Sequence, residues 1–171
     1  LTTFLCSGLH RGECILHRAG TAGDAGVRRE RKCTTVDDLT RGRDLTDLTR
    51  LTATDLLALY RSGPVSPTDV TRAVLDRIDR LNPALNAFCH LAPDEALASA
   101  AASTDRWRRG TPCGPLDGVP VSIKDLILTK GWPTLRGSRT VDPAQPWDID
   151  APVTARLREA GAVILGKTTT P

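Results

Sequence analysis

The run Gly114-Pro-Leu-Asp-Gly-Val-Pro-Val-Ser-Ile-Lys-Asp125 carries the strongest structural pattern in this sequence. In its second half the apolar residues Val119, Val121 and Ile123 alternate with other side chains. Alternation with a period of two predicts a β-strand. The glycines and prolines before it favour backbone turns, and a segment rich in Gly, Thr and Pro comes after it. We therefore expect a strand that leads into a loop.

The sequence after this loop predicts a helix and a second strand. Asp150 can cap a helix that contains Val153 and Leu157 at i, i+4, and Gly161 is placed to end it. The short apolar run 162–165 suits a buried strand. The order strand, loop, helix, strand indicates an α/β sheet protein.

Three helices are predicted upstream of the first strand. Thr52-Ala-Thr-Asp55 has the form of a capping box, and Gly63-Pro64 supplies a stop. A further helix should begin near Pro93 and run to about Arg109, where Gly110 ends it.

The helix between those two has the clearest pattern. Ser66-Pro67 offers an N-cap followed by a first-turn proline. A single apolar stripe at helical spacing follows, formed by Val70, Val74, Ile78 and Leu81. We expect an amphipathic helix here.

Composition limits the class of protein. The 171 residues are 40% hydrophobic and 25% charged, as in soluble globular proteins. The net charge of +3 is scattered, without the basic stripe that nucleic-acid binding requires, and no apolar run is long enough for a membrane span. The 5 cysteines are odd in number and show no repeated short spacing, so we expect reduced thiols and a cytoplasmic location.

Residues 1–50 differ from the rest of the chain. Glycines interrupt any helical pattern, and Leu-Thr pairs recur at a spacing of three that matches neither helix nor strand. We expect a disordered or artefactual leader, with the folded part at 51–171. Four possible zinc ligands lie close together in this leader, namely Cys6, His10, Cys14 and His17. Their spacing matches no familiar zinc finger, so no metal or cofactor is predicted.

Lys124 is the residue whose chemistry matters most. It closes a strand that we expect to be interior, where an ammonium group needs a paired anion or must lose its charge. Asp125 is adjacent, but on a strand it would point to the opposite face. From position alone, Lys124 can be a structural lysine, a surface lysine or a catalytic one.

The run 114–125 resembles the start of the amidase signature family, whose members carry a G-P-L-x-G-V-P-[VI]-x-[IV]-K-D segment. The helix beginning at Ser66-Pro67 also fits, and the resemblance covers about Thr52 to Pro171. It implies N-terminal helices followed by the first strands of a mixed sheet. Further matches follow in order: Gly131 with Thr134, Gly137-Ser138, Asp150-Ala151, Leu157, Ala160-Gly161-Ala162 and Gly166-Lys167-Thr168.

The resemblance implies an amide hydrolase with a triad of a lysine, a serine in a cis peptide and a nucleophilic serine. Lys124 matches the lysine. The two serines belong to a Gly/Ser-rich segment that would follow Gly166-Lys167-Thr168, and the sequence ends at Pro171 before reaching it. Ser122 fills the strand pattern, and Ser138 has no glycine-rich oxyanion loop around it. We expect the fragment to be inactive alone.

Several alternatives stay open. The amidase subunit of a tRNA-dependent amidotransferase would share these motifs, and a non-catalytic interaction module could retain this part of the fold. The spacing of Gly161 to Gly166-Lys167-Thr168 meets the phosphate-loop pattern, but an apolar strand fills the supposed loop. Cys89 beside His90 suggests a thiol and a base, although a helix-end pair is the ordinary interpretation. We expect a small-molecule amide as substrate, with no direct nucleic-acid or membrane partner.

Overall fold

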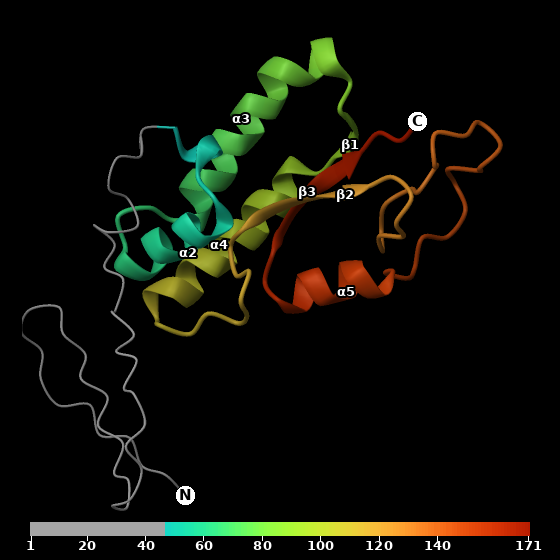
Figure 1. Cartoon of the computed structure of the whole chain (residues 1–171). Helices are drawn as coiled ribbons and strands as arrows, with labels where there is room; N and C mark the ends of the chain where they lie inside the picture. Colours follow the sequence, from blue (N-terminus) through green and yellow to red (C-terminus); the bar gives the residue numbers. More distant parts are fainter. Residues whose placement is uncertain (1–46) are drawn as a thin grey trace, which may run out of the picture. The chain divides into compact units, whose positions relative to one another are not determined.

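The computed structural model describes residues 47–171, and Figure 1 shows the order of their helices and strands. The elements are the 3-10 helix η1 (Leu48–Arg50), α2 (Ala53–Ser62), α3 (Pro67–Leu85), β1 (Phe88–Leu91), α4 (Pro93–Arg108), β2 (Pro120–Lys124), α5 (Pro152–Glu159) and β3 (Val163–Thr168). The four predicted helices and the two predicted strands are all present. The predicted α/β class is confirmed.

The helix starts follow the predicted capping chemistry. At the start of α2 the Asp55 amide donates to Thr52 Oγ1, and the Thr52 amide donates to the Asp55 carboxylate. Ser66 and Asp69 form the same reciprocal pair at the start of α3. The apolar stripe of α3 is buried at its N-terminal end and leaves Leu81 44% exposed.

The three strands form a mixed sheet in the order β1-β3-β2. β3 lies in the centre, antiparallel to β1 and parallel to β2. Parallel neighbours need a crossover connection, and here the loop after β2 and helix α5 provide it. The sheet therefore places β2 beside β3, the last strand of the chain described.

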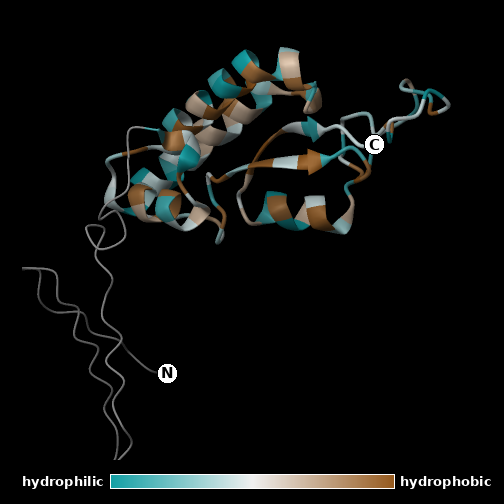
Figure 2. Cartoon of the chain, turned by 45° about the horizontal axis from the view of Figure 1, so that its top comes forward, coloured by the Kyte–Doolittle hydropathy of each residue, from teal (hydrophilic) through white to brown (hydrophobic). Residues whose placement is uncertain are grey.

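Helices cover both faces of the sheet, with α3 and α4 on one side and α5 on the other (Figure 1). Val163 and Leu165 of β3 pack with Ala96 and Ala100 of α4. On the other face, Ile164 packs in a cluster with Ile123 and Trp132, against which Leu157 of α5 lies. Figure 2 shows hydrophobic residues along the strands between these helices. The core thus lies on both sides of β3.

β1 was not predicted. The expectation that Cys89 and His90 sit at a helix end is wrong, because both lie on β1. This strand is only 4 residues long, lies between two helices and lacks a period-two pattern, so pairing with β3 defines it. The strands approach closely at Gly166, where an added Cβ would lie 2.2 Å from the His90 carbonyl oxygen.

The start of α5 differs from the prediction. Asp150 does not cap the helix; the N-cap is Ala151, which makes no side-chain capping bond. The Asp150 carboxylate instead accepts from the Lys130 amide at 2.7 Å and pairs with Arg158 at 3.1 Å. Asp150 therefore ties the loop after β2 to α5.

The folded part begins before residue 51. Residues 47–50, which belong to the predicted leader, include η1, and Arg77 of α3 donates to Thr49 Oγ1 at 2.7 Å. The rest of that leader, with Cys6, His10, Cys14 and His17, lies outside the described residues. Within residues 47–171, no helix is both long enough and apolar enough to cross a membrane.

Candidate active site

The turn that precedes β2 is built around the buried carboxylate of Asp117. Arg106 donates to it through Nε at 2.9 Å and Nη2 at 2.6 Å. Ser103 Oγ donates at 2.6 Å and the Cys113 amide at 2.9 Å. Four donors from α4 and the incoming loop therefore saturate this carboxylate.

These bonds set the ionisation of Asp117. Burial by itself raises the pKa of this carboxyl, but hydrogen bonds from Arg106, Ser103 and the Cys113 amide favour the charged form. The net effect is a pKa below the ordinary value. Asp117 is thus a charged structural anchor at the start of β2.

Two aromatic side chains hold the same turn. Tyr60 Oη donates to the Gly118 carbonyl at 3.1 Å, and Trp107 Nε1 donates to the Asp117 carbonyl at 3.1 Å. Gly118 has φ +83°, and an added Cβ would lie 2.6 Å from Pro67 Cγ. A glycine is required here because both the backbone conformation and the space exclude a side chain.

Lys124 lies at the last position of β2, opposite Thr168 of β3. Its side chain is exposed, so the expectation that it sits on an interior strand position is wrong for the described residues. Strand alternation places its neighbours Ile123 and Asp125 in the interior instead. Lys124 is therefore an accessible amine at a fixed strand end.

The buried lysine is Lys167, whose burial was not predicted from the sequence. It lies on β3 and is fully buried. Its ammonium donates to the Pro133 carbonyl at 2.9 Å and to Thr134 Oγ1, and pairs with Asp125 Oδ1 at 3.0 Å. The signal was present, because Lys167 closely follows the apolar run 162–165.

Asp125 makes two further hydrogen bonds, one through its carboxylate and one through its amide. Its second carboxylate oxygen accepts from the Arg136 amide at 2.9 Å, and its own amide donates to the Thr168 carbonyl at 2.9 Å. As expected from strand geometry, Asp125 points away from Lys124. It joins the end of β2 to both β3 and the following loop.

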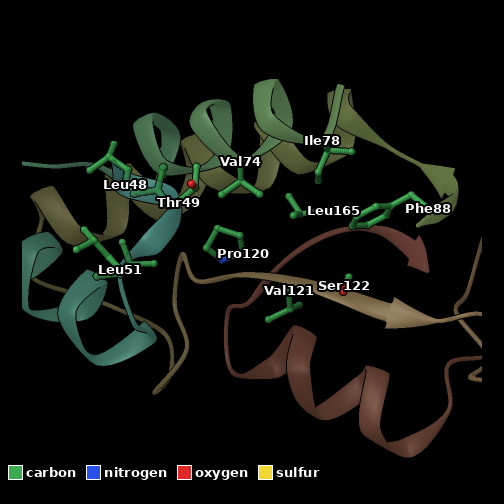
Figure 3. A pocket seen from close by; sticks show the side chains of 12 residues that line it. Leu48, Thr49, Leu51, Val74, Ile78, Phe88, Pro120, Val121, Ser122 and Leu165 are labelled. Atoms are coloured by element: carbon green, nitrogen blue, oxygen red, sulfur yellow. The ribbon is translucent and has the colours of Figure 1, made fainter. Parts of the chain in front are cut away.

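A hollow with a volume of about 300 Å³ lies between α3 and the same face of β2 that carries Ser122 (Figure 3). Its walls are mainly apolar, with Val74, Ile78 and Leu165 among them. Alternation along β2 puts Ser122 and Lys124 on one strand face. Ser138 lies elsewhere, in the exposed loop after β2, where its hydroxyl is hydrogen-bonded to Thr140.

Comparison with known proteins identifies the family. A protein-family model described as Amidase matches residues 69–171. The chain belongs to the amidase family. The matched region begins in α3 and includes β2, Lys124 and the buried Lys167.

Among proteins similar to this amidase chain are two that are named as subunits of glutamyl-tRNA(Gln) amidotransferase. That of Chloroflexus aurantiacus is 44% identical over 123 residues, and that of Salinispora arenicola is 45% identical over 124. Each alignment covers 72% of this chain and 25% of the relative. The chain thus spans about a quarter of the length of these relatives.

Solved structures of amidases superpose on this chain. A bacterial aryl acylamidase of the amidase signature family superposes with a TM-score of 0.66 at 31% identity, covering 72% of this chain and 26% of that one. The peptide amidase of Stenotrophomonas maltophilia superposes with a TM-score of 0.60 at 40% identity, covering 72% and 24%. The fold described above is therefore the fold of this part of an amidase.

The predicted thiol and base, Cys89 and His90, lie on β1. Burial raises the pKa of the Cys89 thiol and lowers that of His90. Cys89 Sγ contacts the Lys167 carbonyl, and the His90 ring lies 5.0 Å from that of Trp132. The two side chains thus have separate partners, Lys167 for the thiol and Trp132 for the imidazole.

The remaining candidates concern phosphate and metal ions. Gly166-Lys167-Thr168 lies within β3, so it forms no phosphate-binding loop. Among the described residues, no group of three or more His, Cys, Asp and Glu side chains could hold a metal ion. Lys124, by contrast, is accessible at the end of β2.

Proposed function

We propose that this chain is the lysine-bearing part of an amide hydrolase, in which Lys124 is the base that activates a nucleophilic serine. The observation that supports this best is the placement of Lys124. It is an exposed amine at the end of β2, and the residue that follows it, Asp125, is held by a buried ion pair. Lys130 lies in the following loop, where its amide donates to Asp150, whose ion pair with Arg158 is partly exposed.

The chemistry uses the neutral amine. Lys124 Nζ accepts the proton of a serine hydroxyl, directly or through a second serine, while the serine oxygen attacks the amide carbonyl carbon. Collapse of the tetrahedral intermediate breaks the C–N bond, and the proton goes to the leaving amine. Water then cleaves the acyl-serine ester and releases the acid. Backbone amides near the nucleophile would hold the oxyanion.

Both serines of this mechanism are proposed to come from residues beyond these 171. No two serines are adjacent in the sequence, and Ser122 sits beside an apolar hollow rather than among oxyanion donors. Among the described residues, the edge of β2 away from β3 has no strand partner. An unpaired edge beside an apolar hollow is what a sheet with further strands presents.

Amide hydrolysis assays test this function. The DNA on both sides of the reading frame is sequenced, and the longer protein with a Gly/Ser-rich segment after Pro171 is expressed beside the 171-residue chain. On simple aryl and alkyl amides we expect turnover by the longer protein only. Lys124→Ala should abolish it, and Lys130→Ala, at an exposed lysine of the loop, should not. Turnover that survives Lys124→Ala would refute the proposal.

A second candidate is the amidase subunit of a tRNA-dependent amidotransferase. The named amidotransferase subunits at 44% and 45% identity favour it. In that case the protein would work with partner subunits encoded nearby. Co-purification with the product of a neighbouring gene for such a partner would support this candidate, and an active enzyme without partners would support a free-standing amidase.

The third candidate is a non-catalytic interaction module. It predicts that the 171-residue chain is monomeric in gel filtration and melts cooperatively in circular dichroism. Aggregation of the chain would instead fit a sheet with an open edge. For each candidate we propose a cytoplasmic location, because the cysteine pattern does not suit a secreted disulfide framework.

A further inference from the structure

We propose that Lys167 is a positioning residue for Lys124, because its buried ion pair with Asp125 holds the end of β2 from which Lys124 projects. This inference rests on the proposed function. It concerns two charged residues, Asp125 directly after β2 and Lys167 on β3, that the chemistry of Lys124 does not itself use.

The contacts of Lys167 use the whole ammonium group. An ammonium has three hydrogens to donate, and Lys167 has three acceptors: Asp125, the Pro133 carbonyl and Thr134 Oγ1. These acceptors belong to the end of β2 and to the loop after it. One side chain of β3 therefore ties the residue that follows Lys124 to the loop at residues 133–134.

Asp125 transmits this restraint to the backbone of Lys124. One oxygen of its carboxylate pairs with Lys167 and the other accepts from the Arg136 amide at 2.9 Å. Its amide bonds to the Thr168 carbonyl, and Lys124 itself pairs with Thr168 in the sheet. The residue that follows Lys124 is thus fixed through its backbone and through both carboxylate oxygens.

A buried ion pair of this kind fixes the orientation of the groups that it joins more than it stabilises the fold. Apolar residues of similar size often stabilise a core at least as well as a buried pair does. What they cannot supply is a set of directional bonds to two different segments, the end of β2 and the loop after it. Because a long flexible lysine can serve as base only within reach of its serine, the position of its backbone matters to the reaction.

The sheet offers a matched control at the other end of β2. Asp117 is also fully buried and pairs with Arg106 at 2.6 Å, but it precedes β2 and lies seven positions before Lys124. Breaking that pair disturbs a comparable buried carboxylate without touching the segment next to Lys124. A purely structural role of the two pairs would give the same kinetic effect at both ends.

The test measures amide hydrolysis by the longer protein that carries the Gly/Ser-rich segment, well below the melting temperature of each variant. We expect Lys167→Met and Asp125→Asn to lower kcat by about 10²-fold, as a small misplacement of a catalytic group can do. KM should stay within about twofold, since substrate binding does not involve this pair. Arg106→Met and Asp117→Asn should keep the wild-type kcat.

The double variant Asp125→Asn/Lys167→Met decides the matter where a single variant fails to fold, because it leaves no unpaired charge in the core. A folded double variant with low kcat and unchanged KM supports the inference. A double variant with wild-type kcat overturns it, as does an equal loss of kcat in the Asp117 control. If the wild type is inactive or the Lys124→Ala variant stays active, the proposed function itself fails, and the inference fails with it.

Discussion

The two ends of β2 are both held by a buried carboxylate, but in different ways. Before the strand, Asp117 takes its donors from side chains of α4 and from a loop amide. After the strand, Asp125 takes its donors from a buried lysine of β3 and from a loop amide. Arg106 keeps 25% of its side chain exposed, whereas Lys167 is completely enclosed.

This difference separates two tasks. At the Asp117 end a partly hydrated guanidinium anchors the turn to a helix that forms from local sequence signals. At the Asp125 end an enclosed ion pair connects the residue after β2 to β3, which lies far along the chain. Lys124 lies at the second end, so the more enclosed of the two anchors is the one next to the proposed base.

The largest effect on stability is expected at the enclosed pair. Lys167→Met leaves the Asp125 carboxylate buried without its cation, and we expect a loss of about 3–5 kcal/mol in the free energy of unfolding. The double variant Asp125→Asn/Lys167→Met should recover most of this loss. Urea unfolding followed by circular dichroism gives both values. Additive losses in the double variant would show that the two groups do not act as a pair.

A smaller effect is expected at the partly exposed pair. Arg106→Met leaves Asp117 with donors from Ser103 and the Cys113 amide, and water can reach part of the site. We expect a loss of about 1–3 kcal/mol in the same unfolding measurement. Arg108→Met, at the exposed pair with Asp105, is the matched control and should cost at most about 1 kcal/mol. An Arg106 loss as large as that of Lys167→Met would remove the distinction between the two ends.

The pH dependence of the free energy of unfolding should contain a contribution from the Asp117 carboxyl. The pKa of Asp117 lies below the ordinary 3.8 in the folded chain, so the folded form binds this proton less readily than the unfolded form. The resulting stabilisation is complete above pH 3.8 and falls as the pH drops through the folded pKa. Melting temperatures from pH 5 to pH 2 should decline less steeply in Asp117→Asn than in the wild type. Parallel curves would contradict the assignment.

The smallest effect concerns His90, on the strand next to Lys167. Burial lowers the pKa of His90, and its Nε2 is a buried atom without a hydrogen-bond partner. His90→Phe keeps the ring against Trp132 and should leave stability near the wild-type value at pH 8. Below pH 6.5 the unfolded wild type gains a proton, so the variant should become the more stable of the two. If the stability of the variant minus that of the wild type is lower at pH 5 than at pH 8, the prediction is contradicted.

The local features of the fold could be predicted from the sequence. The capping box Thr52–Asp55, the N-cap at Ser66 and the alternation before Lys124 use neighbouring residues only. Each of them forms as predicted. Local patterns decide such features because helix starts and single strands depend on residues a few positions apart.

The features that were not predicted from the sequence depend on distant partners. Lys124 and Lys167 both end strand patterns, and only the parallel pairing of β2 with β3 shows which of them is enclosed. Asp150 has the residue type of a helix cap, yet Arg158 and the Lys130 amide take its carboxylate. Four-residue β1 exists because β3 pairs with it. In each case a tertiary partner outweighs the local signal.

The role of Lys124 as a base is tested most directly by Lys124→Arg in the longer protein. A guanidinium keeps the positive charge and a similar length but cannot give up its proton, so it cannot accept one from a serine. We predict that kcat/KM for amide hydrolysis falls by about 10²–10⁴-fold, as in Lys124→Ala. Retention of wild-type hydrolysis by the arginine variant would show that position 124 supplies charge alone, and would contradict the proposed mechanism.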